Sequence, residues 1–454
     1  MTYTVDSFFQ ELDGILSSNG KTGSLSECVT LNVTHNPQRI AQLQLSLQPY
    51  NSKQLNDIME NRKTFQNLSW PAFENFIIKY LLCIRDFDPW SLIDSIDLFI
   101  SVFEAETLLL NPKVGKNDRI CFMLLPHFQE TMSILLPLCE LVDTESMHIN
   151  NRTNDYPRCK YMSTLLLKAL NNIRSTPDLN TINNAAKIDL LMRISIKLCE
   201  VYYKVGSPML CSNVYSNINI LGLNRRLIKK SLLVRYRFLM GKFYAHRSNF
   251  IVSFHHLNAC FNTINLQTCP KHTVAQILKY LVPIGLIVGK VSNIEFVKVF
   301  SERLYEIYQP LIFNYKTGNL RGLYESIEKY RDFYKNTQIW IQLIQRLRVP
   351  VLRNLTLHIF KNNNGIKFNQ LKYGLQLSIE GIELLPSVYH ICEHGVSDEF
   401  VSNILISLSF NAFVKLKMVD SKSFVVSKTD TFPDMYGIVK GRYSLNPKES
   451  WLDN

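Results

Sequence analysis

The sequence GKFYAHRSNFIVSFHHLNAC, residues 241–260, indicates the fold of much of this chain. A glycine is followed three residues later by an aromatic residue, and then by small or apolar residues at helical spacing. Tetratricopeptide-type hairpins need close helix–helix approach, an aromatic filler and small side chains at such positions. The match is partial, because no tryptophan occupies the leading position, so we predict only a tetratricopeptide-like helical hairpin. Its key residues are Gly241, Tyr244, Ser253, Leu257 and Cys260.

Helical periodicity extends in both directions from this hairpin. From about residue 40 to residue 203, apolar residues return every three or four positions, and short breakers such as residues 86–90 separate the helices. Strand signals are nearly absent here, so the sequence predicts a mainly α fold of stacked antiparallel helical hairpins. After the hairpin we expect further helices at Val274–Val288, Phe296–Tyr308, Leu320–Phe333 and Ile339–Leu347.

The last hundred residues predict a different module. Helices are expected at Val349–Phe360 and Lys367–Ile379, and Ser397 can cap the start of a third helix. Two alternating runs, Ala412–Met418 and Ser423–Ser427, lie on either side of a short polar turn, which is typical of a small β-hairpin. Three helices followed by a hairpin form a winged helix, a relative of the helix-turn-helix readers of DNA.

These patterns divide the chain into five predicted parts. The two ends carry glycine, serine, proline or scattered charge, and we expect them to be loose. In order, the parts are a loosely ordered N-terminal segment (1–35), N-terminal helical repeats (36–205), a second set of helical repeats (206–345), a winged helix (346–430) and a flexible tail (431–454).

Charge is unevenly distributed along the chain. The 94 residues from Val201 to Ile294 contain twelve lysines or arginines and no aspartate or glutamate. Outside this window there are 38 basic and 38 acidic side chains, so the window accounts for the whole formal charge of +12. Such one-sided charge favours an acidic partner, either a nucleic acid or an acidic protein. A lysine-rich solvated face would give the same pattern.

The sequence argues against several classes of protein. It lacks the GxSxG, GxGxxG, Walker and HExxH motifs, so we expect neither an enzyme nor a cofactor. Residues 390–394 read HICEH, the inverted zincin pattern, but they fall in a predicted loop, and no metal site is expected. Ten cysteines without a CxxC pair are typical of buried thiols in an intracellular protein. The first residues show no signal-peptide pattern, and the most apolar run, residues 280–288, is too short to span a bilayer.

Six short stretches, in their order and spacing, resemble one protein family. They are RDFDPWS (85–91), SPMLCSN (207–213), YLVPIGLIVGK (280–290), YKTGNL (315–320), RNL (353–355) and VVSK (425–428). Helical repeats that run into a C-terminal winged helix are the layout of the PCI family of proteasome-lid, signalosome and initiation-factor subunits. The six stretches are most similar to the PCI subunit of the second nuclear transcription-and-export complex (TREX type), in its fungal branch. The resemblance covers roughly residues 80–430.

The resemblance implies a non-enzymatic scaffold subunit. Members of this branch pair side by side with a larger PCI scaffold of the Sac/GANP type. That scaffold binds a small acidic protein of the Sem/DSS type, which can also reach the subunit's helical repeats. The two winged helices then form a joint platform for RNA or DNA in transcription-coupled mRNA export. The expected location is the nucleus, at nuclear pores, without membrane insertion.

A second interpretation stays open at this point. A signalosome-associated PCI protein linked to splicing shares most of the C-terminal motifs, and a proteasome-lid-type subunit has the same layout. Either of these would bind only proteins.

Two sets of basic residues are the candidate sites. Lys415 and Lys417 share one face of an alternating strand, and a wing of this kind contacts phosphates, although a hairpin used only for PCI pairing would look the same. We expect nucleic-acid contact at Arg346, Arg348, Arg353, Lys415, Lys417, Lys422 and Lys428. The acid-free window is expected to receive the acidic subunit, or alternatively to carry a nuclear-import signal, at Arg225, Arg226, Lys229, Lys230, Arg235, Arg237 and Lys242.

Overall fold

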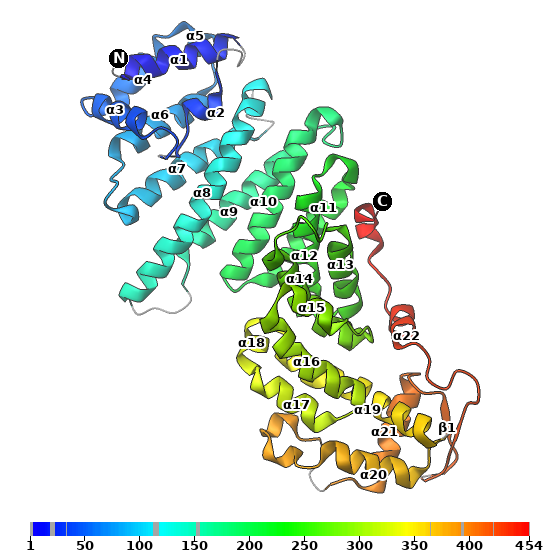
Figure 1. The fold of residues 1–454 in the computed structure, drawn as a ribbon. Coiled ribbons are helices and arrows are strands. Elements are labelled where there is room, and N and C mark those ends of the chain that lie inside the picture. Colours follow the sequence, from blue (N-terminus) through cyan, green and yellow to red (C-terminus); the bar gives the residue numbers. More distant parts are fainter. Residues whose placement is uncertain are drawn as a thin grey trace. The chain divides into compact units, whose positions relative to one another are not determined.

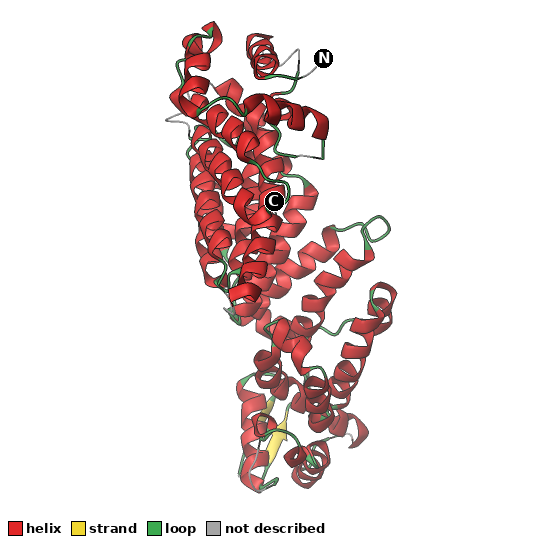
Figure 2. Ribbon diagram, turned by 90° about the vertical axis from the view of Figure 1, so that its left-hand side faces the viewer, coloured by secondary structure: helices red, strands yellow, loops and turns green. Residues whose placement is uncertain are grey.

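The computed structural model describes residues 3–18, 23–32, 34–111, 118–150, 155–363, 365–391, 395–420 and 422–453. In these residues helices dominate, and one two-stranded antiparallel sheet accompanies them (Figure 2), which confirms the predicted mainly α class. Among the same residues, no helix combines the length and apolar character that crossing a bilayer requires. The chain divides into two compact units: unit 1 is Met1–Leu232 with Lys448–Asn454, and unit 2 is Leu233–Pro447.

Unit 1 is built from helices that pack on their neighbours along the chain (Figure 1). Its α-helices are α1 (Val5–Ser18), α2 (Leu25–Cys28), α3 (Pro37–Leu47), α4 (Ser52–Glu60), α5 (Lys63–Leu68), α6 (Pro71–Asp86), α7 (Leu92–Leu109), α8 (Asp118–Asn150), α9 (Pro157–Arg174), α10 (Ala185–Lys204) and α11 (Cys211–Leu221). In α6 the predicted apolar stripe is confirmed: Phe73, Phe76, Ile77 and Tyr80 are buried. Pro71 lies in the first turn of α6, where its missing N–H would have had no helical partner.

The N-terminal segment is part of the core of unit 1. Phe8, Phe9 and Leu12 on α1 have no exposed surface, and the Phe8 ring stacks on Tyr80 of α6 with 5.9 Å between centroids. An ion pair between Asp13 on α1 and Arg62, just before α5, at 2.9 Å, also joins α1 to the rest of unit 1. The expectation of a loose segment over residues 1–35 is therefore wrong for α1, because its apolar face is buried against α2, α3 and α5 and the Tyr80 ring of α6.

A histidine and a glutamate form a pair inside unit 1. Nδ1 of His127 on α8 lies 2.7 Å from Oε1 of Glu106 on α7, and neither side chain has any exposed surface. Burial raises the pKa of Glu106, whereas the neighbouring carboxylate raises the pKa of His127 against the effect of burial. The two groups therefore share a proton in the core, where a lone charge would be costly.

Replacing His127 with alanine is expected to destabilise the protein by about 3–5 kcal/mol, because the Glu106 carboxyl then stays buried without its partner. The loss should be larger at pH 8 than at pH 5. The folded variant must hold Glu106 protonated, while the unfolded chain releases that proton above its ordinary pKa. Urea denaturation followed by circular dichroism measures both effects.

The double variant Glu106→Leu/His127→Leu is the control for this prediction. It removes both polar groups, so most of the stability should return. A loss equal to that of His127→Ala would show that packing, rather than the pair, accounts for the effect.

Unit 2 contains the remaining helices and the sheet. They are α12 (Lys230–His246, which begins just before the unit boundary), α13 (Phe250–Thr263), α14 (Lys271–Val288), α15 (Ile294–Phe300), α16 (Glu302–Thr317), α17 (Leu320–Lys329), α18 (Arg331–Asn336), α19 (Trp340–Asn363), α20 (Phe368–Ile379), α21 (Asp398–Phe410), β1 (Leu416–Met418), β2 (Phe424–Val426) and α22 (Met435–Arg442).

The hairpin of α12 and α13 has the close approach that its sequence predicts. A Cβ atom placed on Gly241 would lie 2.6 Å from Cγ of Leu257, so only glycine fits there. Oγ of Ser253 donates to the Gly241 carbonyl at 2.7 Å, and the Cys260 thiol donates to the Val234 carbonyl at 3.3 Å. Small residues at these positions therefore bring the two backbones together.

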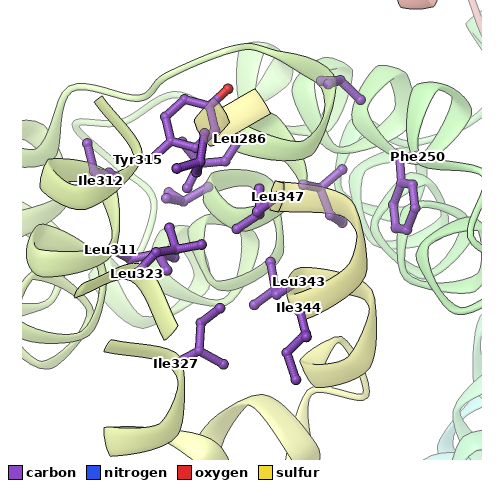
Figure 3. Close-up of a cluster of buried hydrophobic side chains, with 14 of the residues drawn as sticks. Phe250, Leu286, Leu311, Ile312, Tyr315, Leu323, Ile327, Leu343, Ile344 and Leu347 are labelled. Atoms are coloured by element: carbon purple, nitrogen blue, oxygen red, sulfur yellow. The ribbon is translucent and has the colours of Figure 1, made fainter. Parts of the chain in front are cut away.

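The core of unit 2 lies among α16, α17 and α19. Leu311, Leu323, Ile327, Leu343 and Leu347 have no exposed surface, and their side chains point toward one another (Figure 3). Leu323 and Ile327 on α17, like Leu343 and Leu347 on α19, are four residues apart, and the buried residues of α16 also return every three or four positions, which produces the apolar stripe that the packing needs.

The helix α19 is longer than the sequence suggests. Two separate helices, Ile339–Leu347 and Val349–Phe360, were expected, but the structure has one helix from Trp340 to Asn363 with Pro350 inside it. Proline removes one backbone hydrogen bond from a helix and often ends it. Here Leu347 and Val351 on either side are fully buried, and their packing holds the helix together across the proline.

The C-terminal helices and hairpin agree closely with the sequence pattern. Oγ of Ser397 accepts from the Phe400 N–H at 3.1 Å and so caps α21 as predicted. β1 and β2 pair antiparallel, with Lys417 opposite Val425. Leu416 is buried between the exposed Lys415 and Lys417, as the alternation requires.

The tail is folded rather than loose. Met435 of α22 is 4% exposed, and a 3-10 helix at Pro447–Leu452 buries Trp451 and Leu452. Nε1 of Trp451 donates to Oδ1 of Asn219 at 3.0 Å, within unit 1. The expectation of a flexible tail over residues 431–454 is wrong, because these apolar side chains find buried positions.

Candidate nucleic-acid and partner interfaces

The net charge of the protein belongs to unit 2. Residues 233–447 contain 26 lysines and arginines against 14 aspartates and glutamates, a formal charge of +12. The residues of unit 1 contain 24 of each kind, a formal charge of zero. An anionic partner is therefore attracted to unit 2 more strongly than to unit 1.

The basic residues predicted for an acidic partner are divided between the units. Arg225 in unit 1 donates to the Asp453 carbonyl at 2.9 Å and so holds the C-terminal segment. Lys229 pairs with Asp189 at 3.3 Å, while Arg226 and Lys230 are exposed. All four belong to unit 1.

In unit 2 the same predicted set contains one buried side chain. Arg235 is exposed and Lys242 is half-buried. Arg237 is only 3% exposed and lies close enough to the Cys260 thiol to influence its charge. The prediction that Arg237 contacts a partner is therefore wrong, because its side chain is enclosed by the α12–α13 hairpin.

Arg353 is half-buried, and backbone carbonyls accept from most of its guanidinium donors, contrary to its predicted role in nucleic-acid contact. Its guanidinium donates to the carbonyls of Pro433 at 2.8 Å, Phe413 at 3.3 Å and Phe432 at 3.4 Å. Burial lowers the pKa of Arg353. Because these donors are occupied by backbone oxygens, Arg353 holds the segments around the hairpin in place. Arg348, one turn earlier on α19, reaches the Tyr324 hydroxyl at 3.4 Å.

The hairpin lysines differ in how far aspartates neutralise them. Lys415 pairs with Asp430 at 2.8 Å, and Lys422 pairs with Asp398 at 2.6 Å. Asp398 also accepts from Lys372 at 2.6 Å, and the hydrogen bonds from Lys372 and Lys422 lower its pKa to about 2. Lys417 and Lys428 are exposed, with no ion pair recorded in the described residues. These two lysines are therefore the most available cations of the hairpin.

Arg346 lines a cleft together with two arginines from other elements. The cleft has a volume of about 630 Å³ and is bordered by the α12–α13 turn, α14, α19, the end of α21 and α22. Arg247 and Arg442 join Arg346 there, and none of the described lining residues is an aspartate or glutamate. Nη2 of Arg442 donates to the Phe410 carbonyl at 3.1 Å, which fixes one side of the cleft.

Several large apolar side chains on α20, α21 and β2 of unit 2 are exposed. Tyr373 and Leu377 lie one turn apart on α20, and they are 63% and 54% exposed. Ile406 and Phe410 lie one turn apart on α21, at 51% and 83%, and Val425 on β2 is 62% exposed. Large apolar groups gathered on neighbouring elements mark protein contacts more often than isolated ones do.

The described residues show neither a cluster of metal-ligating side chains nor a disulfide. No group of three or more His, Cys, Asp or Glu among them can hold a metal ion. Their nine cysteines form no disulfide, and burial raises the pKa of Cys139 and of Cys260 to about 12, which makes these thiols poor nucleophiles. The last three residues of the HICEH stretch lie outside the described residues.

Similarity to known proteins extends over most of the chain. It is 26% identical over 396 residues to "Nuclear mRNA export protein THP1" of Saccharomyces cerevisiae, covering 84% of this chain and 86% of that protein. This chain is a homologue of the yeast nuclear mRNA export protein. The family resemblance predicted from the sequence is thereby confirmed.

Two further relatives match smaller parts of this export-protein homologue. "Enhanced ethylene response protein 5" of Arabidopsis thaliana is 24% identical over 246 residues, 54% of this chain and 57% of that protein. "Protein CSN12 homolog" of Gibberella zeae is 24% identical over 168 residues, 36% of each. No family model matches the chain.

The sequence did not predict several residues of the arginine cleft and of the exposed apolar groups on α20, α21 and β2. Arg247 lay in the acid-free window but was not chosen, and Arg442 lay in a segment expected to be loose. Arg247 and Arg442 share one sequence signal: no aspartate or glutamate lies near either of them in the chain, so no neighbouring carboxylate neutralises their charge. The exposure of Phe410 has no such signal, because an apolar residue at the end of a helix is as often buried.

Replacing Asp398 with asparagine is expected to strengthen binding to a single-stranded RNA oligonucleotide. The change removes the carboxylate that neutralises Lys372 and Lys422, so up to two more cations can meet phosphates. The plot of log affinity against log salt should become steeper by about 0.7 for each additional cation that meets a phosphate. Since the pKa of Asp398 is about 2, the effect should be constant between pH 5 and pH 8.

Glu383→Gln is the matched control, because Glu383 is exposed and the change in charge is the same. Fluorescence anisotropy at five salt concentrations gives the slopes. A slope that changes equally in both variants would mean that only the net charge of unit 2 matters.

Proposed function

We propose that this chain is a non-enzymatic scaffold subunit of a nuclear mRNA export complex that couples transcription to export. The similarity to a nuclear mRNA export protein over 84% of the chain carries the proposal. The architecture supports it, since helical layers with exposed basic and apolar surfaces suit the assembly of partners rather than chemistry on a small substrate. We place the complex in the nucleus, at nuclear pores.

The C-terminal module is proposed to be a winged helix of the PCI type. Its elements are the end of α19, then α20, α21 and the β1–β2 hairpin, which pack on one another. Preceding it, the α12–α13 hairpin and the helices up to α18 would be the tetratricopeptide-like part of the PCI domain. A larger PCI scaffold of the Sac/GANP type is the proposed partner of the exposed apolar side chains on α20, α21 and β2.

A small acidic protein of the Sem/DSS type is the proposed partner of the acid-free window. The exposed members of the predicted set are Arg226, Lys229 and Lys230 in unit 1 and Arg235 in unit 2, and Lys229 is paired with Asp189. Arg237 is excluded from this contact by its burial. The interaction would weaken with salt, because exposed charges are screened within about 10 Å at 0.1 M ionic strength.

RNA or DNA is the proposed ligand of the basic surface of unit 2. The support is the charge of +12 together with three arginines in one cleft and the two available hairpin lysines, Lys417 and Lys428. Guanidinium groups hold phosphates through paired hydrogen bonds, which gives affinity without reading the base sequence.

A second candidate function is a signalosome- or proteasome-lid-type subunit that binds only proteins. The similarity to the CSN12 homologue of Gibberella zeae favours it, although this match covers 36% of the chain. The two functions differ in their partners. A tagged full-length chain purified from nuclear extract should bring down the large PCI scaffold and the small acidic protein. Recovery of signalosome subunits in their place would overturn the export proposal.

The double variant Lys417→Ala/Lys428→Ala tests the nucleic-acid part of the proposal. It should lower the slope of log affinity against log salt by about 1.4 for single-stranded RNA, about 0.7 for each phosphate that is no longer neutralised. Lys316→Ala/Lys329→Ala is the control, since both lysines are exposed in unit 2 but far along the chain from the hairpin. No measurable RNA binding by the complete complex would contradict this part.

Phe410→Ser tests the pairing surface. The side chain is 83% exposed, so thermal unfolding should hardly change, whereas affinity for the co-purified scaffold should fall about tenfold or more. Leu384→Ser is the control, because Leu384 is 79% exposed in the same unit. Equal affinity of the two variants, measured by interferometry, would remove α21 from the interface.

A further inference from the structure

A separate apolar groove lies in unit 1. It has a volume of about 220 Å³ and is formed by the chain after α2, the α6–α7 turn, α7 and α8. Most of its lining is apolar and includes Leu31, Phe87, Leu92, Phe99, Ile134 and Leu138. This volume is below the roughly 300–1,000 Å³ of small-molecule pockets. It suits one or two inserted side chains of a protein partner.

Trp90 is close in sequence to residues that line this groove, and its side chain is almost fully exposed. It is 95% exposed, the largest exposed fraction among the big apolar side chains of the described residues. Leu92, which lines the groove, is two residues away, so their Cα atoms are at most about 7 Å apart. Ile93 in the first turn of α7 is 44% exposed. Tryptophan is among the residues that most often dominate protein interfaces.

The turn that carries Trp90 is held by internal hydrogen bonds. The Trp90 N–H donates to Oδ1 of Asp88 at 2.8 Å. The Asp88 N–H donates to Oγ of Ser95 at 3.0 Å, and that hydroxyl donates back to the Asp88 carbonyl at 3.0 Å. Ser95 is 1% exposed, so the turn is anchored in the core. Trp90 is thus presented to solvent by a fixed turn, which reduces the entropic cost of binding.

The surroundings of Trp90 are acidic. Residues 86–97 contain four carboxylates and no lysine or arginine, the reverse of the acid-free window. Arg85 pairs with Asp86, and Arg158 pairs with Asp97. Asp88 and Asp94 are exposed on either side of Trp90, and no ion pair is recorded for them in the described residues. An apolar site between two uncompensated carboxylates favours a partner that carries positive charge next to an apolar anchor.

We propose that the groove and Trp90 bind a basic, amphipathic segment of a protein partner. An aliphatic side chain of the segment fills the groove, a second one packs on Trp90 and Ile93, and lysines or arginines beside them meet Asp88 and Asp94. This docking surface lies in the electrically neutral unit and has the opposite charge preference to unit 2. It does not depend on the export function, and it gives the protein a second partner of different chemistry.

A 14-residue peptide made only of leucine and lysine at helical spacing is the probe for a first test with the full-length chain. Trp70 and Trp451 are buried and Trp340 is half-buried, so Trp90 dominates quenching of tryptophan fluorescence by acrylamide. Binding of the peptide should lower the quenching constant of the wild-type protein at least twofold.

Variants of the surface decide whether that signal comes from the proposed site. With a labelled peptide in fluorescence anisotropy, Trp90→Ala should reduce affinity about tenfold or more. Asp88→Asn/Asp94→Asn should reduce both affinity and its dependence on salt. Ile182→Ala, which removes another highly exposed apolar group of unit 1, and Asp57→Asn/Glu60→Gln, which removes two other exposed charges, should have no effect.

Three results would overturn the proposal. The first is equal affinity of the wild type and Trp90→Ala, with thermal unfolding showing that both are folded. The second is equally tight binding of a peptide in which glutamate replaces every lysine. The third is a wild-type dimer in light scattering that Trp90→Ala converts to a monomer, because the occupant would then be a second copy of this chain.

Discussion

The guanidinium of Arg353 ties α19 to the segments that come before and after the β1–β2 hairpin. One side chain on α19 donates to three carbonyls that follow it by 60, 79 and 80 residues in the chain. The backbone oxygens replace the water that the half-buried cation has given up, which makes its partial burial tolerable. Lysine could not take its place, because only arginine spreads several donors in one plane. Phe413 precedes β1 and lines the arginine cleft, and α22 follows Pro433, so the walls of this cleft depend on the contact.

Positive charge in unit 2 is thus used in two ways. Arg353 donates hydrogen bonds to backbone carbonyls of the same unit, and Lys415 and Lys422 form ion pairs with nearby aspartates. Arg346, Lys417 and other cations face solvent without such compensation. The formal charge sets the strength of the long-range field, whereas the positions of the carboxylates decide where a phosphate can approach. An interface predicted from net charge alone would include residues that cannot reach a phosphate.

Sequence periodicity was sufficient to predict the structure wherever the geometry of a single element or contact decides it. The alternation around Leu416 follows from the geometry of a strand, and Gly241 follows from the need for two helices to touch. It failed where a local rule competes with burial. Pro350 lies inside α19 because the side chains on either side of it are packed, and α1 is ordered because Phe8 and Phe9 are buried.

The candidate site was harder to predict for a different reason. Arg346 and Arg353 lie two turns apart on the same helix and belong to equally basic stretches, yet one is exposed in a cleft and the other is half-buried and bound to backbone carbonyls. Their roles depend on segments 60 residues or more away in the chain. Charge, spacing and residue type in one sequence do not contain that information.

The hydrogen bond between Trp451 and Asn219 joins residues 232 positions apart, although both belong to unit 1. Unit 2 is therefore an insertion within unit 1 in the order of the chain. During translation at about 5–20 residues per second, roughly 10–50 s separate the appearance of these two partners. The surface around Asn219 lacks its Trp451 partner for that time, so it is accessible to chaperones and to incorrect contacts until residue 451 has been made.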